Sequence, residues 1–407
     1  MNPDLMRLID RWAGVPLCFL LTLWDRLRRW LSPRPRRPQP QRILFIELAE
    51  IGGLVVAYPS LAHARRRFPE AEIYFLTFKG GQGILDLMEI VPPANQIIIR
   101  PDGLLRFLGD TIAALRRLRR LRLDAVINLE TYARFSTLLA YLSGAPARVG
   151  FHRFHEEGHY LGDLYTHKVI YNPHRHAAET FITLVEALGE EPDAEPRAKI
   201  PLENASLEVP KIKTTPQARR AVQEMLRRQY PDLNDDHRLV ILNPNASDLV
   251  AARRWPTENF LVVARGLLQD PRVLIVLTGT AQERDHAETV RLALESPRVL
   301  NLAGLTTLAQ LIDLYNQAHL LITNDSGPAH FASLTELPVL VLFGPETPRI
   351  YGPLGENVEK IYLGLACSPC VSVYNQKRSP CTQNRCLRDI PPQLVLEKAR
   401  RKLGIEA

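Results

Sequence analysis

The sequence predicts an α/β protein with two doubly wound, Rossmann-like parallel-sheet domains that face a cleft. Short runs of Val, Ile and Leu alternate with helical stretches of ten or more residues, which is typical of βαβ units. These runs lack polar alternation, as expected for strands of a sheet that helices cover on both faces. The 407 residues suit two domains of ordinary size.

The alternation runs twice along the chain. In the first half, the predicted strands are 43–48, 73–78, 96–100, 125–129 and 148–151, and the predicted helices end near 67 or span about 84–90, 104–121 and 132–142. In the second half, the predicted strands are 239–245, 273–279, 299–304, 320–325 and 339–344, with helices near 257–269, 281–294 and 307–317. The expected parts are an arm and Pro-rich linker (1–41), an N-terminal domain (42–205), a connection (206–235) with a helix near 216–229, a C-terminal domain (236–390) and a final helix (391–407).

The positive charge lies in the arm. Residues 1–42 hold nine arginines and three acidic residues, and so carry six of the seven formal positive charges. A nucleic-acid-binding body would carry this excess itself, so we expect no nucleic-acid partner. The apolar stretch 12–24 is too short to cross a bilayer, which takes ~20 residues. Neighbouring Trp and Arg residues favour peripheral attachment to a membrane surface, and the alternative is a helix packed on the body with a basic face in solvent.

The turn TNDSGPAHFAS (323–333) is the most informative motif. Asp325 and Ser326 are good N-cap residues, Gly327 lets a ligand approach the backbone, and Pro328 suits the start of a helix. Such a helix start offers N–H groups and a positive dipole end to a diphosphate, and His330 lies one turn further on. The alternative is a capped, buried helix without a ligand. Neither G-x-G-x-x-G nor the P-loop motif occurs, which disfavours nicotinamide chemistry and P-loop phosphoryl transfer.

Two other strand ends carry groups that suit a nucleotide. The segment 243–256 contains a hydroxyl and two guanidinium groups, which suit phosphate oxygens: Ser247, Arg253 and Arg254. The segment 277–284 contains Gly279 and then Glu283, whose carboxylate suits the hydroxyls of a ribose. Each segment taken singly is also compatible with a solvated loop.

Together and in order, these segments resemble glycosyltransferase family nine, the ADP-heptose:lipopolysaccharide heptosyltransferases. The matching pieces are ILFIELAEIGGLVVAYPSLAHARRRFPEAEIYFL, ARRWPTENF, LTGTAQER, NLAGLTTLAQLIDLYNQAHLLITNDSGPAHFAS and VLVLFGPETPRIYGP. The resemblance implies a two-domain GT-B fold, with an acceptor-side N-terminal domain and a C-terminal domain that binds a nucleotide-sugar, expected to be ADP-heptose. It implies inverting transfer to a lipid-linked glycan acceptor at the cytoplasmic face of the inner membrane, without a cofactor required for catalysis.

The resemblance also implies residue roles and shows one departure. Ser247 and Arg253 would contact the donor phosphates and Glu283 the ribose, while the turn 325–327 with His330 would hold the diphosphate and the sugar. The family's first turn reads I/M-G-D, and its aspartate serves as the base. Here the turn ends in Gly53, which leaves Glu50 and Glu47 as candidate bases. The alternative is a non-catalytic nucleotide-sugar-binding or scaffold homologue that has lost the base; a UDP- or GDP-sugar donor also stays open.

The sequence contains two further clusters of polar residues. Four cysteines in the loop 366–386 have the spacing C-x2-C-x10-C-x4-C: Cys367, Cys370, Cys381 and Cys386. In a reducing cytosol this spacing is compatible with a tetrahedral zinc site, for which the resemblance implies a structural role, and free thiols or a disulfide are the alternatives. Six histidines between 152 and 176 have no clear ligand spacing and are interpreted as part of a flexible polar loop.

Overall fold

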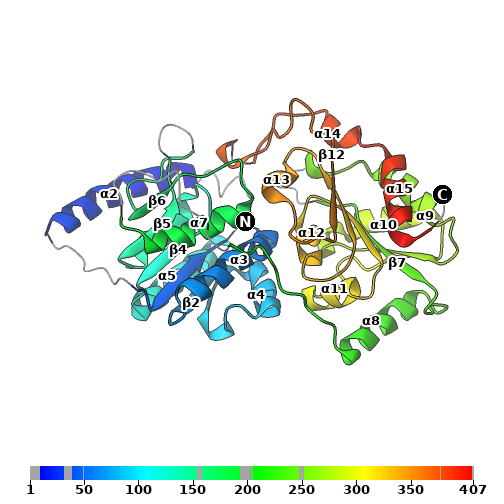
Figure 1. Ribbon diagram of the computed structural model, residues 1–407, viewed down its shortest axis with the longest axis horizontal. Helices are drawn as coiled ribbons and strands as arrows, with labels where there is room; N and C mark the ends of the chain where they lie inside the picture. The colour runs from blue at the N-terminus through cyan, green and yellow to red at the C-terminus, as the bar shows by residue number, and fades with distance from the viewer. Residues whose placement is uncertain are drawn as a thin grey trace. The chain divides into compact units, whose positions relative to one another are not determined.

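The computed structural model describes residues 10–31, 39–48, 50–153, 158–192, 202, 205–246, 252–375 and 377–405. The chain divides into two compact units, Met1–Leu207 and Glu208–Ala407. Each unit contains one six-stranded parallel sheet with helices packed on both faces (Figure 1). The predicted α/β class with two doubly wound parallel sheets is therefore confirmed.

The sheet of the first unit has the strand order β3-β2-β1-β4-β5-β6. Its strands are β1 (Arg42–Ile46), β2 (Glu72–Phe78), β3 (Gln96–Ile99), β4 (Ala125–Asn128), β5 (Ala147–Phe151) and β6 (His167–Val169). Its helices are α2 (Gly14–Leu31), α3 (Ile51–Arg67), α4 (Gln82–Met88), α5 (Leu104–Leu121), α6 (Arg134–Leu142) and α7 (Ala177–Gly189).

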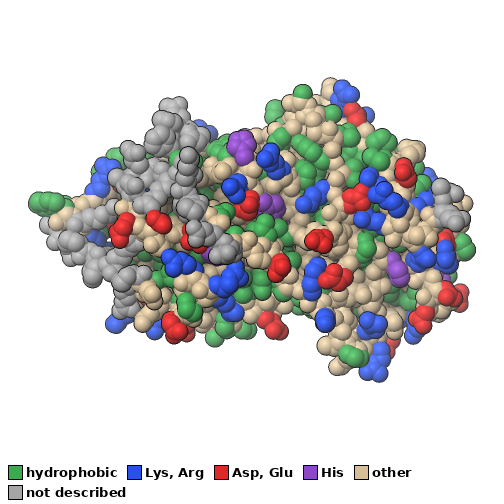
Figure 2. Space-filling model, in the orientation of Figure 1, with side chains coloured by type: hydrophobic (Ala, Val, Ile, Leu, Met, Phe, Trp, Pro, Cys, Tyr) green, Lys and Arg blue, Asp and Glu red, His purple; other side chains and the backbone are tan. Residues whose placement is uncertain are grey.

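The sheet of the second unit has the equivalent order, β12-β11-β10-β7-β8-β9. Its strands are β7 (Arg238–Asn243), β8 (Val273–Leu277), β9 (Val299–Asn301), β10 (Leu320–Asn324), β11 (Val339–Phe343) and β12 (Val358–Tyr362). Its helices are α8 (Pro216–Gln229), α9 (Thr257–Leu267), α10 (Arg284–Leu294), α11 (Leu308–Tyr315), α12 (Gly327–Ala332), α13 (Pro348–Tyr351), α14 (Arg385–Arg388) and α15 (Pro392–Leu403). Lys and Arg side chains mix with Asp and Glu on the face of this unit that Figure 2 shows, as the near balance of charge outside the arm predicts.

The strand order of each sheet indicates at which part of its edge a ligand is expected to bind. In each sheet the chain first builds outward in one direction and then returns to build in the other, so the order reverses between β1 and β4 and between β7 and β10. The loops that leave such a pair diverge to opposite faces of the sheet, and ligands of open α/β sheets bind in the opening between them. The turns after β1, β4, β7 and β10 are therefore where functional side chains are expected.

The histidine-rich stretch is more ordered than the sequence predicted. His167 is buried in β6, which extends the first sheet. His176 caps α7: its Nδ1 accepts the Ala178 N–H, and its own backbone N–H donates to Glu179 in a reciprocal capping box. The interpretation as a flexible loop is thus wrong for these positions, because two of the histidines satisfy backbone and sheet contacts.

Helix α2 packs on the first unit through its polar residues. Asp25 lies 3.6 Å from the guanidinium of Arg148, and both side chains are buried (8% and 3% exposed). One turn earlier, Thr22 Oγ1 accepts the backbone N–H of Asp163 at 2.8 Å. Cys18, a further turn back, is fully buried. The helix therefore faces the protein with a thiol, a hydroxyl and a carboxylate.

The outward side of α2 is mainly apolar. Seven of its large hydrophobic side chains are between 46% and 81% exposed: Leu17, Phe19, Leu20, Leu23, Trp24, Leu27 and Trp30. This distribution is the reverse of the one expected for a helix on the surface of a soluble domain. The helix packs on the body, and its outward side combines these apolar residues with the exposed Arg26 and Arg28, so attachment to a membrane surface stays a prediction. No helix in the described part of the chain is long and apolar enough to cross a membrane.

The pair between Asp25 and Arg148 is expected to contribute strongly to the stability of the first unit. Replacing Asp25 with Ala leaves a buried guanidinium without this carboxylate, which should lower the free energy of unfolding by about 3 kcal/mol. The matched control is Arg26→Ala, which removes a longer, exposed pair with Asp163 and should cost less than about 1 kcal/mol. Urea unfolding followed by circular dichroism measures both, and equal losses would contradict the assignment.

Candidate functional site

The predicted segments of the second unit come together at one edge of its sheet. β7 and β10 are adjacent parallel strands at the reversal of strand order, and β8 and β11 flank them. The turns that follow these four strands therefore meet at the carboxyl edge. Sequence reasoning had singled out the turns after β7, β8 and β10, and the structure adds the one after β11.

Asn324, at the end of β10, connects these turns. Its Nδ2 donates to the backbone carbonyls of Pro244 (3.0 Å) and Asn245 (3.2 Å). Its Oδ1 accepts the backbone N–H of Trp255 at 3.0 Å. The indole N–H of Trp255 in turn donates to the carbonyl of Ile390. A fully buried amide thus fixes the turn after β7 and the approach to α9. Sequence reasoning did not select it, although an Asn that ends an apolar strand is a usable signal.

Arg253 lies between two buried carboxylates. Its Nε is 3.7 Å from Asp325 Oδ2, and its Nη2 forms an ion pair with Glu346. The side chains of Asp325 and Glu346 are 5% and 1% exposed, and that of Arg253 is 13% exposed. A second cation, Lys377, lies 4.0 Å from Glu346 and 5.2 Å from the centre of the Tyr351 ring. The sequence predicted Arg253 and Asp325; Glu346 and Lys377 were missed because they lie far away along the chain.

The second arginine of the pair has a different environment. Nε and Nη2 of Arg254 both donate to the carbonyl of Ala246, at 3.0 and 2.7 Å. These bonds hold the turn after β7, and a role of Arg254 in donor binding stays a prediction. The backbone carbonyl of Arg254 also accepts from the side-chain amide of Asn384. Ser247 lies outside the described residues.

Glu283 and Gly279 lie together after β8. Oε2 of Glu283 accepts the backbone N–H of Thr280 at 2.7 Å and its hydroxyl at 3.0 Å, which caps the short turn that begins α10. A Cβ atom on Gly279 would lie 3.0 Å from this oxygen and 3.1 Å from Asn245 Nδ2. That buried amide nitrogen has no hydrogen-bond partner among the residues that the structure describes, while Oδ1 of Asn245 bonds to His286. A carboxylate and an amide donor therefore converge beside Gly279.

The turn before α12 differs from the prediction in its capping. Ser326 is the N-cap residue, but its hydroxyl donates to the carbonyl of Asn324 and does not cap the helix. Asp325 is directed to Arg253. Pro328 occupies the second helical position, after Gly327, and His330 is half-buried within the helix. The helix has only six residues.

In the first unit, Gly53 lies in the first turn of α3 with two glutamates around it. A Cβ atom on Gly53 would lie 3.0 Å from Oε1 of Glu47 and 3.4 Å from the Cβ of Glu50. Glu47 follows β1 and is 6% exposed, whereas Glu50 is the half-buried N-cap residue of α3. Across the reversal of strand order, Glu130 accepts the backbone N–H of Leu48 at 2.7 Å. The Glu47 carboxylate thus occupies the space that a side chain at position 53 would fill.

The cysteine loop contains one buried and three more accessible thiols. Burial, together with the proximity of the other three cysteines, raises the pKa of the Cys386 thiol to about 11. Cys367 and Cys381 are exposed and Cys370 is half-buried. Within the described ranges, no three His, Cys, Asp or Glu side chains are arranged to hold a metal ion. The zinc site therefore stays a prediction.

Two Rossmann-like units with these strand orders define the protein as one with a GT-B type of fold. The sequence profile of glycosyltransferase family 9 (heptosyltransferase) matches residues 112–379, and the chain belongs to this family. Lipooligosaccharide heptosyltransferase 2 of Campylobacter jejuni is 32% identical over 173 residues, which are 42% of this chain and 53% of that protein. The chain thus spans about half the length of the first curated relatives that it matches.

Solved structures share the fold. The structure of E. coli ADP-heptose LPS heptosyltransferase II has a TM-score of 0.68 and 22% identity, over 89% of this chain and 98% of that one. The E. coli heptosyltransferase WaaC with ADP has a TM-score of 0.61 and 18% identity, over 89% of this chain and 99% of that one. At these identities the likeness establishes the architecture of both units.

Proposed function

We propose that this protein is an inverting glycosyltransferase that moves a heptose from ADP-heptose to a lipopolysaccharide-core or related cell-envelope glycan. Family membership supports sugar transfer, and the names of the similar proteins support heptose, ADP and a lipopolysaccharide or lipooligosaccharide acceptor. The proposal assigns no cofactor to catalysis. The acceptor is a lipid-linked glycan on the cytoplasmic surface of the inner membrane.

The observation that carries this proposal is the position of Arg253. Buried between Asp325 and Glu346, its guanidinium is held at the edge of the sheet where a nucleotide-sugar is expected to bind. A diphosphate leaving group gains negative charge as the sugar departs, and a fixed guanidinium stabilises that charge in bidentate geometry. Lys377 supplies a second cation at the same cluster, and Glu283 with Asn245 supplies polar groups for the ribose or base.

Replacing Arg253 with Gln should weaken donor binding. Loss of a charge-assisted hydrogen bond costs about 1.5–3 kcal/mol, so we expect the Kd for ADP-heptose to rise by roughly 10- to 150-fold. The control is Arg220→Gln, which removes the same charge from an exposed position on α8. Calorimetric titration of both variants with ADP-, UDP- and GDP-sugars measures the effect. Equal affinity of the wild-type protein for all three nucleotides would reject the ADP assignment.

We further propose that Glu47 is the general base that takes the proton of the acceptor hydroxyl. Its carboxylate oxygen lies where a side chain at Gly53 would be, the position at which the family's I/M-G-D turn carries its aspartate. Glu50 approaches the same point through its Cβ, and no carboxylate oxygen of Glu50 is among the atoms nearest that point. A general base in this place contributes about 10²- to 10⁴-fold to the rate.

The variant Glu47→Gln should lower kcat for sugar transfer by at least about 100-fold while the Kd for the donor is unchanged, because only the proton acceptor is lost. Glu50→Gln, the matched control, should keep most of the activity. The double variant Glu47→Ala with Gly53→Asp should recover part of the rate, since Ala leaves room for the new carboxylate. Full activity of Glu47→Gln would contradict the assignment, and donor binding without turnover in the wild-type protein would favour the scaffold alternative.

The arm is proposed to attach the protein peripherally to the membrane that holds its acceptor. The apolar outward side of α2 is the observation that supports this attachment, because seven large hydrophobic side chains are otherwise left in water. Trp24 and Trp30 are residues typical of the membrane–water boundary, and Arg26 and Arg28 are exposed beside them. Co-sedimentation of the full chain with lipid vesicles tests the attachment directly.

The four cysteines are proposed to bind a structural zinc ion, with no part in catalysis. Thiolates bound to zinc would relieve the mutual repulsion that, with burial, raises the pKa of Cys386. Elemental analysis of the purified protein should then find about one zinc per chain, and Cys386→Ser should lose it and lower the Tm. Metal-free protein with an unchanged Tm after chelation would reject the site.

A further inference from the structure

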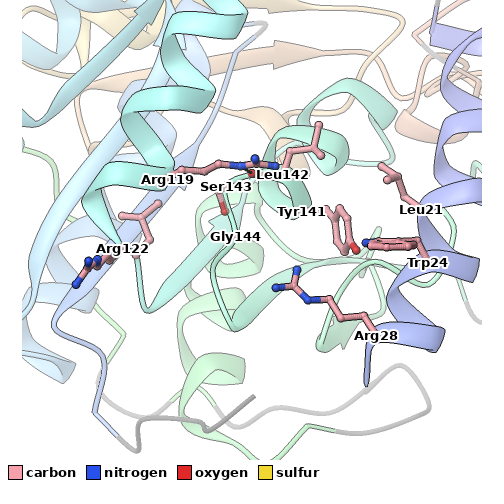
Figure 3. Close-up of a pocket in the computed structure, with 10 residues that line it drawn as sticks. Leu21, Trp24, Arg28, Arg119, Arg122, Tyr141, Leu142, Ser143 and Gly144 are labelled. Carbon is pink, nitrogen blue, oxygen red and sulfur yellow. Dashed lines mark hydrogen bonds between the residues drawn. The ribbon is translucent and has the colours of Figure 1, made fainter. Parts of the chain in front are cut away.

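A pocket of about 510 Å³ lies beside the arm helix in the first unit (Figure 3). Its walls come from α2, from the C-terminal end of α5 and from the turn after α6. Helices that follow parallel strands end at the amino edge of the sheet, opposite the carboxyl edge where Glu47 and Glu50 lie. The pocket is therefore separate from the candidate base of the same unit.

Arginines give this pocket a positive charge. Arg28 and Arg119 point into it from opposite walls, and Arg122 lies at its margin (Figure 3). Nε of Arg119 donates to the carbonyl of Leu142 at 3.0 Å, which holds the side chain in place. Over the ranges that the structure describes, no carboxylate forms an ion pair with any of these three arginines. Among the described residues, these three charges are therefore not neutralised by an acidic partner.

The pocket is also shaped by aromatic side chains. Trp24 from α2 and Tyr141 from α6 both line it (Figure 3). The Tyr141 ring lies 5.2 Å from the guanidinium of Arg148, which is paired with Asp25. The buried contacts that seat α2 therefore also fix this wall of the pocket. Trp24 belongs at the same time to the exposed apolar side of the helix, so the pocket opens next to that side.

This combination of charge and apolar surface selects one kind of ligand. Guanidinium groups bind phosphate oxygens in bidentate geometry. The neighbouring outward residues of α2, such as Leu20, Leu23 and Leu27, have apolar side chains, which pack favourably against the acyl chains of a lipid. A soluble phosphate compound would use only the first feature, whereas a phospholipid uses both.

We propose that this pocket binds the phosphate of an anionic phospholipid headgroup, with the acyl chains of that lipid against the outward side of α2. The site deepens the membrane attachment proposed above and rests on it. The pocket makes the attachment selective for the charge of the lipid headgroup. The apolar side of α2 alone would bind to any bilayer. Arg28 and Arg119 are the positions that determine this selectivity.

The test compares two double variants of the full chain. The pocket variant combines Arg28→Gln with Arg119→Gln. The control variant combines Arg116→Gln with Arg120→Gln. Arg116 and Arg120 are exposed on α5, the helix that also carries Arg119, but they lie outside the pocket. The control variant removes the same charge as the pocket variant. Flotation with phosphatidylcholine vesicles, with and without phosphatidylglycerol, measures binding. With roughly 1 kcal/mol for each arginine at an anionic surface, the pocket variant should lose about 25-fold in affinity for the phosphatidylglycerol vesicles, and the control less than about threefold.

Each other outcome overturns a different statement. Equal losses in both double variants would show that diffuse charge, and not the pocket, attracts the lipid. Unchanged binding of the pocket variant would reject the site while leaving the attachment intact, whereas failure of the wild-type protein to bind any vesicle would reject the attachment itself. Competition by glycerol 3-phosphate as strong as by the lipid would assign the pocket to a soluble phosphate. Binding of ADP-heptose, measured on every variant, should stay unchanged and reports correct folding.

Discussion

The side-chain amide of Asn324 is the contact on which the geometry of the second unit's site depends. Parallel strands fix where loops begin, but the loops carry backbone groups that need partners of their own when they are buried. Two donor bonds and one acceptor bond of this amide join the turn after β7, the approach to α9 and the end of β10. Arg253 lies in the segment held this way, so its position between Asp325 and Glu346 follows from the same contact.

In the first unit, a carboxylate and not an amide links the two loops at the reversal of strand order. There Glu130, which follows β4, accepts the backbone N–H of Leu48 after β1. The two units therefore share a strand order and a side-chain link across its reversal, but they differ in the charge that they present. The second unit presents an arginine and a lysine next to carboxylates, and the first presents carboxylates around a glycine. This division suits a reaction in which one substrate leaves as an anion and the other gives up a proton.

Much of the fold was predictable because strands covered on both faces are continuous apolar runs, and ten of the twelve strands have that form. The two that were missed, β6 and β12, are short or carry charged residues such as Lys360 in an edge strand. The turns of the site were predictable from strand ends. The partners Glu346 and Lys377 were not, since distant segments bring them in. Spacing placed Glu47 and Glu50 near Gly53 but gave no direction to their side chains, which only the structure supplies.

The seating of α2 has a consequence for how the protein meets its acceptor. A helix attached by hydrophobic contacts alone can roll about its axis, because such contacts have little directional preference. Asp25 and Thr22 make directional contacts with Arg148 and the Asp163 backbone, so this helix has one rotational setting. If the proposed membrane attachment holds, the first unit rests on a bilayer at a single tilt. An enzyme oriented in this way searches for a lipid-borne sugar in two dimensions, with the same side always facing the leaflet.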